Sequence, residues 1–119
     1  MSESLDRAVR LFEACADPNR LRILKCLQVR PACVCELVQA LRVPQPRVSR
    51  HLRTLRDAGL VVDSRDAQWV EYSLAPPEKD SDVEALWALI DGGLEDDPQI
   101  AADRKGLETA ARDQCVPGD

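Results

Sequence analysis

The sequence predicts a mostly α-helical fold that carries one β-hairpin. Its length of 119 residues gives room for one hydrophobic core, because an average domain has about 150 residues. That core is expected to be aliphatic, since 45% of the residues are hydrophobic but only 3% are aromatic. The spacing of apolar residues is helical along most of the chain, and it changes to a strand-like pattern only between residues 60 and 74.

Two helices are expected first. From Leu5 to about Cys15, apolar side chains recur along one stripe at helical spacing. Asp17 is then a suitable N-cap, and Pro18 is suited to the first helical position because the N–H that proline lacks is unpaired there in any helix. The second helix is therefore predicted to run from Pro18 to about Gln28.

A third and a fourth helix follow the break at Pro31, and a tight connection around residues 42–46 separates them. The third is predicted over about 33–41 and the fourth over about 46–58. Gly59 is well placed to end the fourth helix in a left-handed conformation. The apolar stripe of the fourth helix consists of Val48, Leu52 and Leu55.

The second half of the chain begins with the hairpin. Residues 60–64 and 69–74 are rich in β-branched and aromatic side chains, and the polar residues 65–68 separate them. A helix is then predicted from Ser81 or Asp82 to the Gly92-Gly93 pair, and an amphipathic stretch over about 99–112, which Gly106 weakens. We expect one domain over residues 1–98, with a helical extension and a mobile, cysteine-containing tail over 99–119.

Charge is distributed unevenly along the chain. The formal net charge is -5, but residues 1–65 sum to +5 and residues 66–119 to -10. Five arginines and no acid lie between positions 42 and 56, and Arg47, Arg50 and Arg53 project away from the apolar stripe of the fourth helix. A run of charge is often only a solvated surface. An arginine fork, however, also fits phosphate or the edge of guanine, and a helix fits the major groove of DNA.

The order of the elements favours the second interpretation. The chain has the order of a winged helix-turn-helix: a helix, a tight turn, an arginine-faced helix and a hairpin with Arg65 at its tip. In such folds the second helix enters the major groove, and the wing reaches phosphates or the minor groove. The predicted fold class is therefore mostly α with a β-hairpin wing, and the predicted partner is double-stranded DNA.

Four segments in this order resemble the ArsR/SmtB family of bacterial metal-responsive winged-helix repressors, and with the hairpin and flanking helices the resemblance covers nearly the whole chain. They are residues 16–24 (ADPNRLRIL), 33–37 (CVCEL), 45–52 (QPRVSRHL) and 55–61 (LRDAGLV). The resemblance implies a homodimer built from the first and last helices, which binds operator DNA and leaves it when a metal ion binds. The DNA-binding residues it implies are Gln45, Arg47, Ser49, Arg50, His51, Arg53 and Arg65.

The cysteines point to the inducer. Without a secretion signal, the five cysteines are expected to be thiols. Cys33 and Cys35 resemble the site of the arsenic-responsive branch of the family, and As(III) or Sb(III) favours three sulfurs. Residue 38, where the family often has a third cysteine, is valine, so Cys115 is the best third ligand, ahead of Cys15 and Cys26. Positions 33 and 35 point about 200° apart on a helix, so binding should distort the first turn of the third helix.

The sequence leaves other functions open. A redox-sensing or persulfide-sensing repressor on the same fold would use the thiols without a metal. A thiol enzyme with Cys33 and Cys35 as a redox pair is not expected, because the sequence has no thioredoxin-like strand pattern. A winged-helix module that only binds another protein would leave the arginine face unexplained. A zinc or nickel site of the kind that the family builds from histidines and carboxylates is not expected, because His51 is the one histidine and suits packing or a DNA phosphate. Four acidic residues are expected to form a solvated face: Asp80, Asp82, Glu84 and Asp91.

The expected location is the cytoplasm. No run of residues approaches the roughly 18 apolar positions that a membrane crossing needs. The first six residues lack the basic flank and apolar segment of a secretion signal. No membrane partner is therefore predicted.

Overall fold

The structure is a computed structural model that describes residues 2–79 and 81–115. Over these residues it is mostly helical with a small antiparallel sheet, as the sequence predicts. In chain order the elements are α1 (Glu3–Cys15), α2 (Pro18–Val29), β1 (Ala32–Cys33), α3 (Val34–Leu41), α4 (Gln45–Asp57), β2 (Val61–Asp66), β3 (Trp69–Leu74), α5 (Asp82–Leu94), α6 (Pro98–Thr109) and the 3₁₀ turn η1 (Arg112–Gln114).

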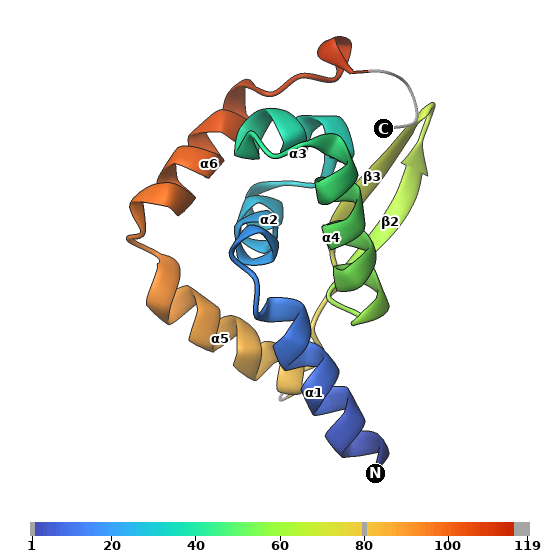
Figure 1. The fold of residues 1–119 in the computed structure, drawn as a ribbon, viewed down its shortest axis with the longest axis vertical. Coiled ribbons are helices and arrows are strands. Elements are labelled where there is room, and N and C mark those ends of the chain that lie inside the picture. Colours follow the sequence, from blue (N-terminus) through green and yellow to red (C-terminus); the bar gives the residue numbers. More distant parts are fainter. Residues whose placement is uncertain (1, 80, 116–119) are drawn as a thin grey trace.

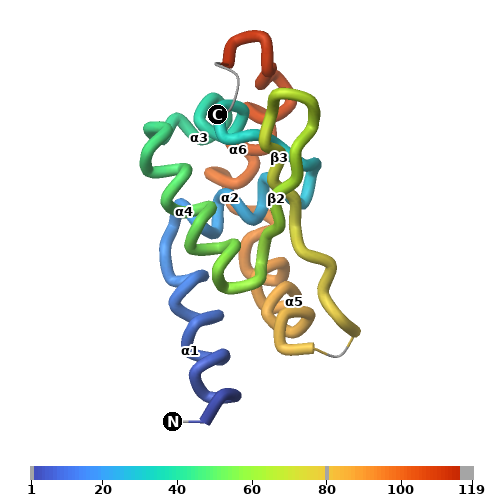
Figure 2. Tube along the Cα trace, turned by 90° about the vertical axis from the view of Figure 1, so that its right-hand side faces the viewer, coloured from blue at the N-terminus to red at the C-terminus, as the bar shows by residue number. Residues whose placement is uncertain are grey.

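Helix α2 lies at the centre of the molecule, with α3, α4, α5 and α6 arranged around it, while α1 extends away from one end (Figures 1 and 2). Ile23 and Leu24 of α2 are fully buried. The apolar stripes of α3 and α4 pack into the same core, so the two helices of the predicted helix-turn-helix rest on α2. In the described part of the chain, no helix combines the length and the apolarity needed to span a membrane.

Two predicted helix ends are confirmed. The Asp17 carboxylate accepts hydrogen bonds from two backbone N–H groups in the first turn of α2, at 2.8 and 3.1 Å. Gly59 follows α4 with φ +80°, and the Leu60 N–H donates to the Leu55 carbonyl at 3.0 Å. This is the left-handed helix end that glycine permits, because a Cβ is disfavoured at positive φ.

The hairpin is confirmed, but its turn is shorter than predicted. Strands β2 and β3 pair antiparallel over their full length, which leaves only Ala67–Gln68 as the turn. Arg65 therefore lies within β2 and not at the tip, because strand pairing continues past it. Ala67 takes φ +56°, a conformation that two-residue hairpin turns often need and that glycine adopts most easily.

A third strand was not predicted. The two residues of β1 pair with Tyr72 and Glu71 of β3, giving the strand order β1-β3-β2. Two residues are too short for a strand pattern to be recognised in a sequence, so only the pairing partner reveals this strand. Its effect is to join the start of α3 to the hairpin.

Helix α5 does not end at Gly92-Gly93, contrary to prediction. It continues through both glycines to Leu94. Trp87 and Ile90 of α5 are buried in the core, and their burial offsets the cost of about 1 kcal/mol that each glycine imposes on a helix. The expectation for Asp91 is refined: its side chain is 46% exposed, but it is not only a solvated acid, because it accepts hydrogen bonds from Lys25 and Gln28 of α2, both at 2.8 Å.

Gly106 does not weaken α6 but allows it to approach α3 closely. A Cβ at this position would lie 2.9 Å from the carbonyl oxygen of Ala40. Leu107, one residue later, is fully buried in the core that α2 and α3 share. The division of the chain at residue 98 stays a prediction, although α6 packs directly on that core.

Replacing Gly106 with alanine is expected to lower the free energy of unfolding by about 1–3 kcal/mol, because the Cβ meets backbone atoms that cannot turn aside. Urea unfolding followed by circular dichroism measures the change. The control is Gly93→Ala in α5, where a Cβ meets open space and a gain of up to about 1 kcal/mol is expected. Equal stability of Gly106→Ala and the parent protein would contradict the close approach.

Candidate functional site

One face of α4 is exposed and basic. Val48, Leu52 and Leu55 are fully buried on the opposite face, as their spacing predicts. Ser49 is half-buried, and its hydroxyl accepts a hydrogen bond from the Gln45 amide at 3.1 Å. The exposed residues of α4 are Gln45, Pro46, Arg47, Arg50, Arg53, Arg56 and, at its C-terminal end, Asp57.

His51 lies on the inner side of α4. It is only 8% exposed, and its Nδ1 lies 3.2 Å from Nη1 of Arg20. Arg20 in turn donates from Nε to the Ala14 carbonyl at 2.7 Å, so these two side chains join α4 to the end of α1. Burial lowers the pKa of His51, although Asp17 opposes this, so the ring is neutral at pH 7. Of its two predicted roles, packing agrees with this burial, and contact with a DNA phosphate stays a prediction.

The hairpin lies beside α4. Arg65 is exposed on β2, and Arg56 of α4 forms an ion pair with Asp63 of β2 at 3.4 Å. A hollow of about 230 Å³ separates the helix from the hairpin, and its lining is Val34, Gln45, Ser49, Arg53, Arg56, Val70 and Tyr72. The arrangement leaves a concave, largely polar surface between two elements that both carry arginine.

Cys33 is fully buried at the start of α3. Its backbone N–H donates to Oε1 of Glu36 at 3.0 Å, which is one half of a capping box. Burial raises the pKa of the Cys33 thiol, so the thiol is protonated at pH 7. The spacing of Cys33 and Glu36 in the sequence was a signal for this cap.

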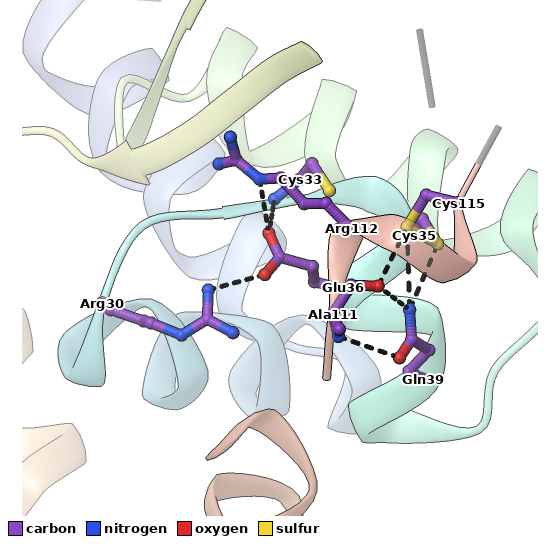
Figure 3. Close-up of a disulfide and its surroundings, with 8 residues drawn as sticks. All are labelled: Arg30, Cys33, Cys35, Glu36, Gln39, Ala111, Arg112 and Cys115. Carbon is purple, nitrogen blue, oxygen red and sulfur yellow. Dashed lines mark hydrogen bonds and ion pairs between the residues drawn. A yellow bond between two sulfur atoms is a disulfide. The ribbon is translucent and has the colours of Figure 1, made fainter. Parts of the chain in front are cut away.

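Cys35 and Cys115 are joined in a disulfide, with their Cα atoms 5.6 Å apart (Figure 3). This corrects two expectations. Not all five cysteines are thiols, because the chain beyond α6 returns to α3 and brings Cys115 to Cys35. Residues 113–115 are also not a mobile tail, since η1 packs on α3; the remainder of the predicted tail, 116–119, lies outside the described residues.

Gln39 holds the C-terminal segment in place (Figure 3). Its amide donates to the Ala111 carbonyl at 3.0 Å and accepts from the Ala111 N–H at 3.1 Å. The same amide nitrogen lies 3.3 Å from the sulfur of Cys35 and 3.6 Å from that of Cys115. Nothing in the sequence pointed to Gln39, because its partners Ala111 and Cys115 are more than 70 positions away.

Glu36 is the centre of an ionic cluster beside the disulfide. It is buried, and it accepts from Nη1 of Arg30 at 2.9 Å and from Nε of Arg112 at 3.2 Å. Although burial opposes the effect, the hydrogen bonds from Cys33 and Arg112 and the charge of Arg30 hold the pKa of Glu36 below its ordinary value. The sequence did not identify Arg112 as part of this site.

The predicted ligands are only partly brought together. Across the described residues, no group of three or more histidine, cysteine, aspartate or glutamate side chains is arranged to hold a metal ion. Cys35 and Cys115 are adjacent, whereas Cys33 is separate. Burial raises the pKa of Cys26 to about 12, which suits a core residue and not a thiolate ligand, and it also raises the pKa of Cys15.

An apolar surface extends over α1 and α5. Phe12 is 65% exposed and Leu89 is 69% exposed, and a hollow of about 300 Å³ lies between the two helices. Large apolar side chains grouped in this way are typical of a protein interface. The resemblance implied a dimer contact on the first and last helices. Most of the exposed large apolar residues, however, lie on α1 and α5, while Ile100 and Leu107 of α6 lie in the core.

Comparison with known proteins gives consistent matches. The family described as bacterial regulatory protein, arsR family, matches residues 17–62. The arsenical resistance operon repressor of Escherichia coli (strain K12) is 44% identical over 69 residues, which are 57% of this chain and only 59% of that protein. The uncharacterized HTH-type transcriptional regulator MJ1325 of Methanocaldococcus jannaschii is 36% identical over 90 residues, which are 75% of this chain and 97% of that protein.

A solved structure agrees with the fold. The homodimeric winged helix-turn-helix DNA-binding domain of Mb0332 from Mycobacterium bovis has a TM-score of 0.67 and 27% identity, covering 80% of this chain and 88% of that one. The predicted winged helix-turn-helix is confirmed. These relatives are regulators by name, which agrees with the expectation that the chain is not an enzyme.

Proposed function

Because the chain belongs to the arsR family of bacterial regulatory proteins, we propose that this transcriptional repressor releases its operator DNA when As(III) or Sb(III) binds its cysteine thiolates. The observation that carries the proposal is the adjacency of Cys35 and Cys115, 80 positions apart in the chain, beside the start of α3. The relative named as an arsenical resistance operon repressor supports an arsenic-resistance operon as the target.

Operator DNA is bound by α4 and the hairpin. The exposed face of α4 enters the major groove, where Arg47 and Arg50 reach base edges or phosphates and Gln45, Ser49 and Arg53 add polar contacts. Arg65 on β2 reaches the backbone or the minor groove beside it. The basic α4 surface overcomes the formal net charge of -5, because binding depends on where the arginines lie.

Two copies of the chain bind a palindromic operator. The contact joins α1 and α5 of one copy to those of the other, since Phe12 and Leu89 are exposed there. The similar Mb0332 domain of Mycobacterium bovis is homodimeric, and this supports the arrangement.

The inducer binds the reduced protein. As(OH)₃ and three thiols give three As–S bonds and three water molecules, each thiol proton leaving with a hydroxyl group. Cys35 and Cys115 supply two sulfurs, and Cys33 supplies the third only after the first turn of α3 unwinds and its N–H leaves Glu36. Because α3 leads directly into α4, this change moves the DNA-binding helix, and a coupling of about 1–3 kcal/mol lowers operator affinity roughly 5–150-fold.

The test is a titration with a duplex that the reduced protein selects from a random-sequence library. Arsenite is expected to lower the affinity of the wild-type protein within that range, and to leave the affinity of Cys35→Ser and Cys115→Ser unchanged. Cys15→Ser is the control, which should respond like the wild type. Release that persists in Cys35→Ser would contradict the proposed inducer site, and failure to select any duplex would favour a protein-binding module.

A second candidate function is redox sensing, and the disulfide between Cys35 and Cys115 favours it. Hydrogen peroxide would take two electrons and two protons from the two thiols, giving the disulfide and two water molecules. The variant Cys33→Ser separates the candidates, because arsenite needs three sulfurs whereas oxidation needs only the pair. If Cys33→Ser still changes its DNA affinity with peroxide but no longer releases DNA with arsenite, the redox response belongs to Cys35 and Cys115 and the arsenite response to all three cysteines. Treatment with polysulfide tests persulfide sensing in the same way.

A further inference from the structure

Arg112 connects three parts of the molecule that are distant in the sequence. Its guanidinium forms ion pairs with Glu36 of α3, with Asp66 at the end of β2 and with Glu71 of β3. The distance from Nη1 of Arg112 to the Asp66 carboxylate is 2.8 Å. Hydrogen bonding to Asp66, with further bonds to the other two acids, raises the pKa of Arg112 above its ordinary value, so the charge is permanent.

The same residue is held rigidly to Cys115. The Cys115 N–H donates to the Arg112 carbonyl at 2.9 Å, which closes the 3₁₀ turn between them. A movement of Cys115 relative to α3 therefore moves Arg112. Figure 3 shows both residues on one segment, with Arg112 directed to Glu36 and Cys115 directed to Cys35.

The two hairpin acids belong to the hairpin that is proposed to contact DNA, and the strand register places them on the face opposite Arg65. Asp66 follows Arg65 directly, and it is 61% exposed. Without a cation beside them, Asp66 and Glu71 would place two negative charges near the phosphates that Arg65 is proposed to reach. Arg112 neutralises them in the conformation described.

From these contacts we infer that Arg112 is a positioning residue which transmits the state of the cysteine pair to the hairpin. The inference rests on the proposed function. It adds a second route by which the inducer site acts on the DNA-binding surface, beside the unwinding of α3. With the C-terminal segment docked on α3, Arg112 pairs with Asp66 and Glu71 and the hairpin accepts DNA. When inducer draws Cys115 toward Cys33, Arg112 leaves the hairpin, and the two carboxylates repel the DNA backbone.

The experiment compares operator affinities of the reduced full-length protein without inducer. Arg112→Ala is expected to bind several-fold more weakly than the wild type. Adding Asp66→Asn and Glu71→Gln to Arg112→Ala should restore wild-type affinity, because the repelling charges are then absent. Lys105→Ala, which removes a positive charge from the exposed surface of α6, is the control and should bind as the wild type does. A triple variant that stays weak would overturn the inference, since a merely structural role of Arg112 predicts no rescue.

A second measurement needs no DNA. Trp69 pairs with Asp66 at the end of the hairpin, and Trp87 lies in the core. In protein labelled with 5-fluorotryptophan, the ¹⁹F signal of Trp69 therefore reports on the hairpin. The variant Trp87→Phe assigns the two signals. Arsenite should shift the Trp69 signal of the wild type but not that of Arg112→Ala. Arsenite absorbance bands without a Trp69 shift in the wild type would overturn the inference.

The two measurements separate this inference from the proposed function. If arsenite neither binds nor releases DNA but the rescue is observed, the proposed inducer is wrong and the role of Arg112 stands. If release depends on Cys35 and Cys115 but the rescue fails, the proposed function stands without Arg112. A protein that binds neither DNA nor arsenite contradicts both.

Discussion

Replacing Arg47 and Arg50 together with alanine is expected to weaken operator binding by about 2–6 kcal/mol. Each bidentate contact of an arginine with guanine is worth about 1–3 kcal/mol, and separated positions contribute almost additively. Both side chains lie on the exposed face of α4, opposite the buried Leu52, so their loss leaves the fold intact. The measurement is fluorescence anisotropy with the selected duplex at several salt concentrations.

The salt series distinguishes the two kinds of contact. Removal of an arginine that binds a phosphate lowers the slope of affinity against salt concentration by about one and weakens binding to all DNA sequences alike. Removal of an arginine that contacts a base relaxes specificity at one position. Lys105→Ala on α6 is the control and should change neither quantity. Unchanged affinity of the Arg47/Arg50 double variant would remove this face of α4 from the DNA contact.

Replacing Asp103 with alanine is expected to lower the free energy of unfolding by about 3 kcal/mol. Asp103 of α6 is only 2% exposed, and it pairs with Arg22 of α2 through two hydrogen bonds, at 2.8 and 2.9 Å. Loss of one partner leaves the other charge partly buried without compensation, which costs about 3–5 kcal/mol in such pairs. The lower figure is expected because Arg22 also donates to Asn19 and to the Leu41 carbonyl.

Urea unfolding monitored by circular dichroism gives this value. Glu108→Ala, an exposed acid on the same helix, is the control and should stay within about 0.5 kcal/mol of the parent protein. A loss for Asp103→Ala no larger than that of the control would mean that the ion pair does not hold α6 on α2.

The helices of the DNA-binding half were predictable because their signals are local. The stripe of Val48, Leu52 and Leu55 determines which face of α4 is buried, and so which face carries the arginines. Asp17 and Gly59 mark helix ends through contacts within a few residues. No distant partner is needed to interpret such patterns.

The glycines show where local rules fail. Glycine was predicted to end a helix at Gly92-Gly93 and to weaken one at Gly106, yet α5 continues through the first two and α6 needs the third. Helix propensity differs by only about 1 kcal/mol between glycine and alanine, so packing decides the outcome. Whether a glycine meets open space or the backbone of Ala40 depends on a neighbouring helix that the sequence does not reveal.

The candidate site divides in the same way. The sequence by itself determined the fold class and the basic face of α4, because residue type and helical period are properties of short segments. The choice of Cys33, Cys35 and Cys115 as ligands came from the resemblance to a known family and stays a prediction. Only the tertiary structure decided that Cys115 meets Cys35, that His51 faces inward and that Arg112 joins the hairpin to α3. The physical reason is that these contacts link residues dozens of positions apart. They exist only after burial of the common core has brought α4, α6 and the segment beyond α6 onto α2 and α3.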